Sequence, residues 1–265
     1  MFKKIIKSID YIIIAILIVL FIIGVIALYS ANGGSQGNQS EAEKQVVWFF
    51  IGFTVMMAIV FIDYEWIAKL WIPIYIVSVI SLIAVLFTAP VNGATSWFNV
   101  FGVGIQPSEF AKIAIILGLA QIIVLYKKKI NKPLTLLCII LFAMIPIFLV
   151  VKQPDYGTAM VLVAILAFML FLGGIDYKYI IVAAILAAIS LPMLYNFILP
   201  EHAKSRIEVF LNPQTDPQGA GYNIIQAKLA VGSGQLWGMG LFEGNQTQLR
   251  IFTNESYRFY ICSNR

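Results

Sequence analysis

The stretch YIIIAILIVLFIIGVIALY, from Tyr11 to Tyr29, has no charged side chain. About 20 apolar residues carry a helix across the roughly 30 Å hydrocarbon core of a bilayer, so this stretch predicts a transmembrane helix. Lys3, Lys4 and Lys7 precede it, as the basic residues of a signal peptide would. A cleavable signal has an apolar region of only about 7–15 residues, so we expect a retained helix whose start is cytoplasmic.

Six more apolar runs follow the first one. They are Val46–Ile62, Trp71–Thr88, Phe110–Tyr126, Leu134–Val151, Thr158–Leu172 and Tyr179–Leu199. The whole chain is 60% hydrophobic and 12% charged, whereas soluble domains are roughly 45–50% apolar and about 25% charged. The sequence therefore predicts an all-α, polytopic integral membrane protein, with about seven transmembrane helices in residues 1–199.

The basic residues are grouped beside the apolar runs, which is typical of topology signals in membrane proteins. An inside start places Lys127, Lys128, Lys129 and Lys132 on the cytoplasmic side, where such residues accumulate. The same alternation puts residues 92–107, residues 152–156 and everything after Pro200 outside. The net charge of +5 is thus explained without nucleic acid, which we exclude as a partner.

Residues 200–250 have a different composition from the spans. An amphipathic stretch from Glu201 to Glu208 opens this segment, Asn223–Val231 is predicted to be a short helix, and several prolines and glycines lie between them. A loop of this length is uncommon unless it is functional or disordered, and its apolar residues argue against disorder. We expect a folded extracellular loop, followed by a separate tail of residues 251–265.

Asp216 is the carboxylate of this loop with the most distinctive surroundings. It lies between Pro213 and Pro217, and Gly219 and Gly221 follow. Proline fixes φ and glycine relaxes it, which favours a rigid turn that presents the carboxylate. Local sequence leaves two interpretations open, a turn-forming aspartate and a general base.

The remaining candidate residues also have two interpretations each. Glu109 and Lys112, three residues apart at a helix start, are expected to pair or to cap that helix. Asp155 is expected to be a helix N-cap or a groove contact, and Trp97 an interfacial anchor or a substrate contact. Five basic residues would contact lipid head groups or an anionic substrate: Lys152, Lys204, Arg206, Lys228 and Arg250.

Three segments on the predicted outer side carry a family resemblance. They are GATSWF (93–98) leading to QPSEFAK (106–112), then KQPDYGT (152–158), then NPQTDPQGAGYNIIQAKLAVGSGQLWGMG from Asn212. Together they resemble the SEDS family, named for shape, elongation, division and sporulation. GNQTQLR at residues 244–250 resembles the elongation branch, RodA, rather than the division branch, FtsW. Ser96 departs from the family pattern, because many members carry Arg or Lys there.

The resemblance implies a ten-helix fold in the bacterial plasma membrane and a peptidoglycan glycosyltransferase that polymerises lipid II on the outer face. In that reaction the C4 hydroxyl of one sugar attacks the anomeric carbon of another, and a lipid pyrophosphate leaves. Asp216 matches the family's catalytic aspartate. The substrate-binding candidates are Trp97, Glu109, Lys112, Lys152, Asp155, Lys204, Arg206 and Lys228.

The resemblance also bears on partners and cofactors. It implies a class B penicillin-binding protein that crosslinks the strands. Cationic groups or a divalent cation would stabilise the leaving pyrophosphate. His202 is the only histidine, so no multi-histidine zinc site is predicted. No other cofactor is expected.

The tail IFTNESYRFYICSNR (251–265) departs from the family, whose members continue with a segment like FLPxNHTDFIFAVIGEE and three more helices. A back-translation of this tail, read one base further on, gives FLPMNHTDFIFAVI. We therefore expect a frameshift after codon 250 and an inactive truncated product. Sequencing the gene across that codon tests the expectation.

A transporter or flippase for the lipid-linked precursor is the competing function. Intramembrane charges often mark a transport pathway. Here Glu109, Lys112, Asp155 and Asp216 are instead expected at the outer boundary, which favours chemistry at the membrane surface.

Overall fold

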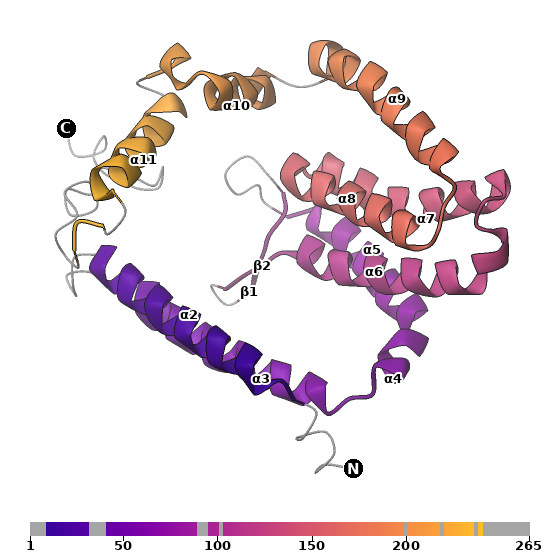
Figure 1. Ribbon diagram of the computed structural model, residues 1–265, viewed down its shortest axis with the longest axis horizontal. Coiled ribbons are helices and arrows are strands. Elements are labelled where there is room, and N and C mark those ends of the chain that lie inside the picture. The colour runs from indigo at the N-terminus through magenta and orange to yellow at the C-terminus, as the bar shows by residue number, and fades with distance from the viewer. Residues whose placement is uncertain are drawn as a thin grey trace. The chain divides into compact units, whose positions relative to one another are not determined.

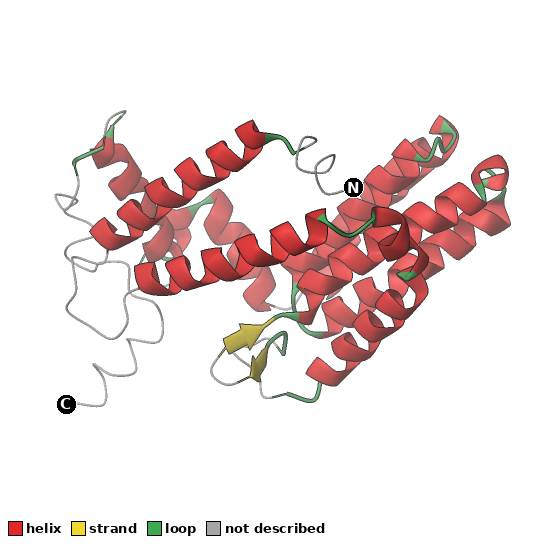
Figure 2. Cartoon of the chain, turned by 90° about the horizontal axis from the view of Figure 1, so that it is seen from below, coloured by secondary structure: helices red, strands yellow, loops and turns green. Residues whose placement is uncertain are grey.

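The computed structural model describes residues 9–31, 41–88, 95–100, 103–198, 201–217, 220–235 and 238–240. It has two compact units, Ile62–Ile189 and Met1–Phe61 with Ser190–Arg265, and each is described by itself. Helices form nearly all of the regular structure that is described (Figure 2). Several residues named above lie outside the described ones: Lys3, Lys4, Lys7, Gly93, Gly219 and residues 241–265.

All seven predicted runs are helical. They are α2 (Tyr11–Ala31), α3 (Glu41–Val60), α5 (Trp71–Val85), α6 (Pro107–Leu125), α7 (Pro133–Lys152), α8 (Tyr156–Leu172) and α9 (Tyr177–Met193). In the described part of the chain, five of them are long and apolar enough to cross a membrane, whereas α5 and α8 are shorter apolar helices. Helix α9 continues into a π-helical turn at Leu194–Ile198.

Helices α5, α6, α7 and α8 form the core of the unit 62–189, and α4 (Tyr64–Lys69) precedes them. Helix α5 packs against α6, and both α6 and α7 pack against α8 (Figure 1). Leu82, Ile115, Leu119, Ile139 and Leu162 are fully buried at these contacts. The outward faces carry exposed apolar side chains, as expected for helices in contact with lipid.

An aromatic cluster fixes α5, α6 and α7 together. The Phe142 ring stacks on Tyr75 with centroids 4.1 Å apart and meets Trp71 edge-on. The Tyr75 hydroxyl donates a hydrogen bond to the Phe142 carbonyl, 2.7 Å away. Gly118 leaves room for this ring, since a Cβ there would lie 2.5 Å from Phe142 Cζ.

We expect Gly118→Ala to destabilise the protein by about 1–3 kcal/mol, because the added methyl group displaces the Phe142 ring from a well-packed core. Thermal unfolding in detergent micelles measures this effect. Gly52→Ala on α3 is the matched control, since nothing lies within 4 Å of a Cβ there. Equal unfolding midpoints for the two variants would rule out the close approach of α6 and α7.

A small β-hairpin is the one departure from the all-α prediction in the described residues. Strands β1 (Phe98–Val100) and β2 (Val103–Ile105) pair antiparallel, with Phe98 opposite Ile105. The hairpin lies within residues 92–107, which the sequence predicted only as an outer loop. Strands of three residues are too short to give a recognisable alternation of polar and apolar residues.

The other unit contains α2 and α3, which pack together through stacked Phe21 and Phe49 rings. It also contains α10 (Glu201–Leu211), the 3₁₀ turn η3 (Pro213–Thr215) and α11 (Ala220–Gly234). The amphipathic stretch and the short helix predicted in residues 200–250 are therefore confirmed. The predicted divisions 1–199, 200–250 and 251–265 stay predictions.

Candidate functional site

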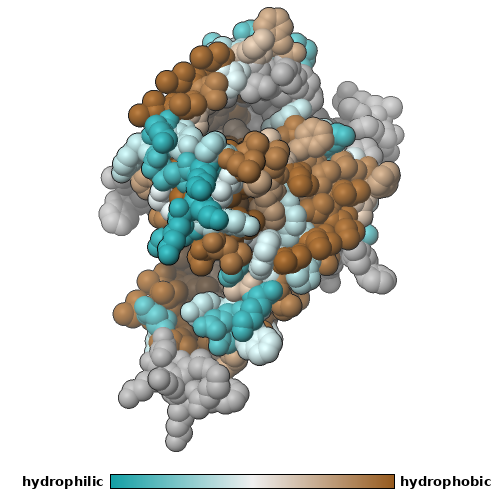
Figure 3. All heavy atoms as spheres, turned by 90° about the vertical axis from the view of Figure 1, so that its right-hand side faces the viewer, coloured by the Kyte–Doolittle hydropathy of each residue, from teal (hydrophilic) through white to brown (hydrophobic). Residues whose placement is uncertain are grey.

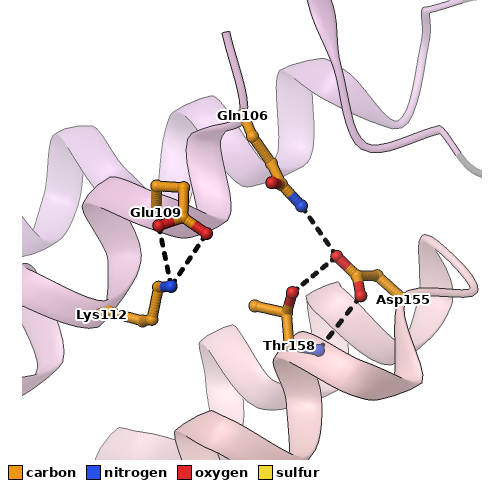
Figure 4. A network of polar contacts seen from close by, with 5 residues as sticks. All are labelled: Gln106, Glu109, Lys112, Asp155 and Thr158. Atoms are coloured by element: carbon orange, nitrogen blue, oxygen red, sulfur yellow. Dashed lines mark hydrogen bonds and ion pairs between the residues drawn. The ribbon is translucent and has the colours of Figure 1, made fainter. Parts of the chain in front are cut away.

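Asp155 joins the starts of α6 and α8. Its Oδ1 accepts a hydrogen bond from the Thr158 backbone N–H at 3.1 Å, and its Oδ2 accepts one from the Thr158 hydroxyl at 2.8 Å. The Gln106 side chain, just before α6, donates a third bond to Oδ2 at 2.9 Å (Figure 4). The predicted N-cap is confirmed, and the same carboxylate also ties the two helix starts together.

We expect Asp155→Ala to expose the first turn of α8 to exchange with solvent, because loss of an N-cap costs about 0.5–2 kcal/mol. Hydrogen exchange at the Thr158 amide measures this loss. The matched control is Asp63→Ala, since Asp63 caps α4 through the Glu65 amide at 3.0 Å. An unchanged exchange rate at Thr158 in Asp155→Ala would contradict the capping role.

Glu109 and Lys112 form the ion pair that their spacing predicted. The Lys112 ammonium lies 2.8 Å from each carboxylate oxygen of Glu109, in the first two turns of α6 (Figure 4). The Glu109 side chain is 56% exposed and that of Lys112 is 27% exposed. The pair is therefore accessible from solvent, and either partner could exchange the other for a ligand of matching charge.

Gln153 anchors the segment that precedes the hairpin. The buried side-chain amide of Gln153 donates a hydrogen bond to the Leu82 backbone carbonyl at 3.0 Å. The backbone carbonyl of Gln153 accepts a hydrogen bond from the buried Ser96 hydroxyl at 3.4 Å. Sequence reasoning did not single out either Gln106 or Gln153. Each glutamine directly precedes a proline at or just before the start of a helix, in QPSE before α6 and in QPDY before α8. This repeated Gln-Pro pair is the sequence signal that could have indicated the two glutamines.

Trp97 follows Ser96 and stands at the base of the hairpin. Its ring lies over Gly104 of β2, where a Cβ would be 3.1 Å from Trp97 Cε3. The side chain remains 42% exposed. The Trp97 ring is thus held against β2, and part of the ring remains accessible to a ligand.

Lys152 ends α7 and is exposed, and its ammonium lies 4.9 Å from the centre of the Phe148 ring. An ammonium over an aromatic face is attracted by the ring quadrupole. This contact orients the Lys152 side chain along its own helix.

The Asp216 turn belongs to the other unit and is built by η3. The Asn212 side chain accepts a bond from the Gln214 amide at 3.3 Å, and the Asn212 carbonyl accepts from the Thr215 amide and hydroxyl at 3.1 and 2.9 Å. Asp216 follows directly, with an exposed side chain. The predicted turn geometry around this carboxylate is confirmed.

Gly221 closes that turn against the start of α11. Its amide donates to the Asp216 carbonyl at 3.0 Å. A Cβ at position 221 would lie 2.6 Å from the same carbonyl oxygen and would also meet the Pro213 carbonyl. Only glycine lets these backbone segments approach so closely.

The other predicted basic residues differ in their surroundings. Lys204 is 20% exposed, and its ammonium lies 3.3 Å from Glu201 and 3.4 Å from the Asn196 carbonyl. Lys228 is exposed on α11. Arg206 lies in α10, but its side chain is outside the described residues. No group of three metal-ligating side chains comes together within the described ranges.

The chain is similar to known proteins over most of its length. Residues 10–261 match the family model for FtsW, RodA and SpoVE, described as a cell cycle protein. The peptidoglycan glycosyltransferase MrdB of Escherichia coli K12 is 36% identical over 241 residues, which cover 89% of this chain and 63% of that protein. The chain therefore spans less than two thirds of the length of this relative.

Two solved structures are similar to this chain. One, described as the structural coordination of polymerization and crosslinking by a peptidoglycan synthase complex, has a TM-score of 0.66 at 25% identity and covers 80% of this chain and 63% of the other. The second is the rod shape determining protein RodA of Thermus thermophilus, with a TM-score of 0.53 at 25% identity, covering 64% of this chain and 57% of the other.

Proposed function

The chain belongs to the FtsW, RodA and SpoVE family of cell cycle proteins, and from this membership we propose that it carries the catalytic loop of a peptidoglycan glycosyltransferase. The proposed substrate is lipid II, which the enzyme polymerises into glycan strands during cell elongation. The presentation of Asp216 supports this proposal most directly. A single exposed carboxylate stands on a turn whose backbone is fixed by Asn212 and by Gly221.

Asp216 acts in this proposal as the general base. Its carboxylate accepts the proton of the attacking C4 hydroxyl as that oxygen bonds to the anomeric carbon and the bond to the lipid pyrophosphate breaks. General-base assistance of this kind is worth about 10²–10⁴-fold in rate. The closed turn keeps the carboxylate at a fixed position, which such assistance requires.

The leaving pyrophosphate needs cationic partners. Lys228 and Lys152 are exposed, which suits direct contact with the diphosphate. Lys112 and Lys204 already pair with Glu109 and Glu201, so they would contribute by exchanging partners.

Trp97 and Asp155 would serve the substrate in different ways. The exposed face of Trp97 offers a flat apolar surface on which a sugar ring could stack. Both carboxylate oxygens of Asp155 already accept hydrogen bonds, from Thr158 and Gln106. We therefore propose that Asp155 positions the two helix starts.

The location of charge favours an enzyme over a transporter. In the described parts of α2, α3 and α5 to α9, Asp, Glu, Lys and Arg occur only in the first or last two turns of each helix. A transport pathway would place such groups near the middle of spans.

We further propose a class B penicillin-binding protein as partner and the bacterial plasma membrane as location, with a cytoplasmic N-terminus and the Asp216 loop outside. A similar solved structure is described as a peptidoglycan synthase complex that coordinates polymerization and crosslinking, which supports the choice of a crosslinking partner. The grouped lysines Lys127–Lys129 support the orientation.

Proteoliposomes with lipid II test the enzyme against the transporter. The protein used is a chimera, in which residues 1–250 are followed by the C-terminal region of the Escherichia coli relative. Glycan strands that depend on Asp216 support the transferase. Lipid II that changes leaflet equally well in wild type and in Asp216→Ala, with no strands formed, supports the transporter.

A further inference from the structure

Two loops meet at the end of the helices opposite to Asp155. Residues 126–132 connect α6 to α7 and include the 3₁₀ turn η1 (Lys127–Lys129), and residues 173–176 connect α8 to α9. Both belong to the unit 62–189. Neither loop takes part in the proposed chemistry.

Asn131 and Asp176 clamp these loops together. The Asn131 amide donates to Asp176 Oδ1 at 2.6 Å, and Asn131 Oδ1 accepts from the Asp176 backbone N–H at 2.8 Å. The Tyr179 hydroxyl adds a bond to the Asn131 carbonyl at 2.8 Å. Three hydrogen bonds between residues about 45 positions apart hold the two loops in one arrangement.

Five exposed lysines surround the clamp and are called the lysine rim: Lys127, Lys128, Lys129, Lys132 and Lys178. Asp176 is the only acidic residue in the two loops, and it pairs with Lys178 at 3.0 Å. Within the described part of the chain the other four lysines have no ion-pair partner. The rim therefore keeps a strong positive charge.

The border of the rim has the composition of a membrane interface. Tyr126 and Tyr177 are exposed beside it. Leu125, Leu134 and Leu172, at the adjoining ends of α6, α7 and α8, are 68%, 73% and 78% exposed. Figure 3 looks onto the side that lies at the right of Figure 1, and it shows hydrophilic patches beside hydrophobic surface. Aromatic residues and lysines above apolar side chains are typical of the head-group level of a bilayer.

We propose that the lysine rim is a binding site for anionic phospholipid head groups, with the clamp holding both loops around one lipid phosphate. Positive charge at the membrane surface attracts anionic lipids of the adjacent leaflet. A preorganised pair of loops loses less conformational freedom on binding than two mobile loops would. This inference is independent of the proposed glycosyltransferase activity.

Native mass spectrometry of the detergent-solubilised 265-residue chain tests the site, with phosphatidylglycerol and phosphatidylcholine as probes. The wild type is expected to bind phosphatidylglycerol at least about tenfold more tightly. The triple variant K127Q/K128Q/K129Q is expected to lose most of this preference. Asn131→Ala keeps every charge and is expected to weaken the preference about threefold, because the loops separate.

The matched control K44Q/R258Q/R265Q removes three positive charges that do not belong to the rim and is expected to keep the preference. Equal losses in the two triple variants would show a net-charge effect and overturn the proposal. An Asn131→Ala variant that binds like the wild type would overturn the role of the clamp. A wild type with no preference for phosphatidylglycerol would leave the rim to a soluble acidic partner and would also overturn the proposal.

Discussion

Asp216→Ala is expected to lower the rate of glycan strand formation by the chimera by about 10²–10⁴-fold, because the proposed general base for the attacking hydroxyl is removed. Gel separation of the strands made from labelled lipid II measures the rate. The turn itself should persist, since the Gly221 amide still donates to the backbone carbonyl of residue 216 and Asn212 still bonds to Gln214 and Thr215.

Two further variants separate the charge from the fold at this position. Asp216→Asn keeps the size of the side chain and removes the base, so it should be as slow as Asp216→Ala. Gln214→Ala removes an exposed side chain of the same turn and should stay near the wild-type rate. Full activity in Asp216→Asn would exclude the carboxylate as the base.

Gly221→Ala is expected to lower the same rate almost as far while leaving the carboxylate in the chain. The added Cβ would lie 2.6 Å from the Asp216 carbonyl oxygen, so the turn has to open and the carboxylate moves. Displacement of a catalytic group by about 1 Å can cost on the order of 10²-fold in rate. Hydrogen exchange should also show that the backbone amide of residue 221 loses protection in this variant. In the wild type this amide donates a hydrogen bond to the Asp216 carbonyl.

Gly232→Ala is the control for this substitution. It makes the same change on the same helix at a position with nothing within 4 Å of the new Cβ. An alanine inside a helix is favoured over glycine by about 0.5–1 kcal/mol, so this variant should be active and no less stable. If both glycine variants had the wild-type rate, the closed turn would not be needed for activity.

The helical part of the fold could be predicted because the length and apolar character of a span are local properties. The predicted all-helical, polytopic fold is confirmed by the likeness to the two solved structures. Helix ends were less accurate. Helix α5 ends at Val85 and not at Thr88, and α6 begins at Pro107, three residues before the predicted Phe110. Proline suits the first turn of a helix, although it does not look like part of an apolar run.

The candidate site could be predicted only where the contact is local. Glu109 and Lys112 are three residues apart, and Asp155 caps the helix that begins at the next residue. The contacts from Gln106 to Asp155 and from Gln153 to Leu82 join residues 49 and 71 positions apart. Such pairs depend on how α5, α6, α7 and α8 pack. The spacing of residues along the sequence does not predict that packing.

The Asp216 turn lies between these cases. Its prolines and glycines predicted a turn, and the structure adds the reason why one glycine is needed, since Gly221 sits against two carbonyl groups. The catalytic role comes from the family resemblance, because a turn-forming aspartate would have the same local sequence. The substrate roles of Trp97 and of the basic residues likewise stay proposals.

Incubation of the purified chimera with labelled lipid II in detergent micelles tests the central claim most directly, because a micelle has no second leaflet and transport gives no signal there. We predict glycan strands and released lipid pyrophosphate with Asp216 in place, and neither product after Asp216→Asn. Lipid II recovered unchanged from folded chimera, or strands made equally well without the carboxylate, would contradict the account.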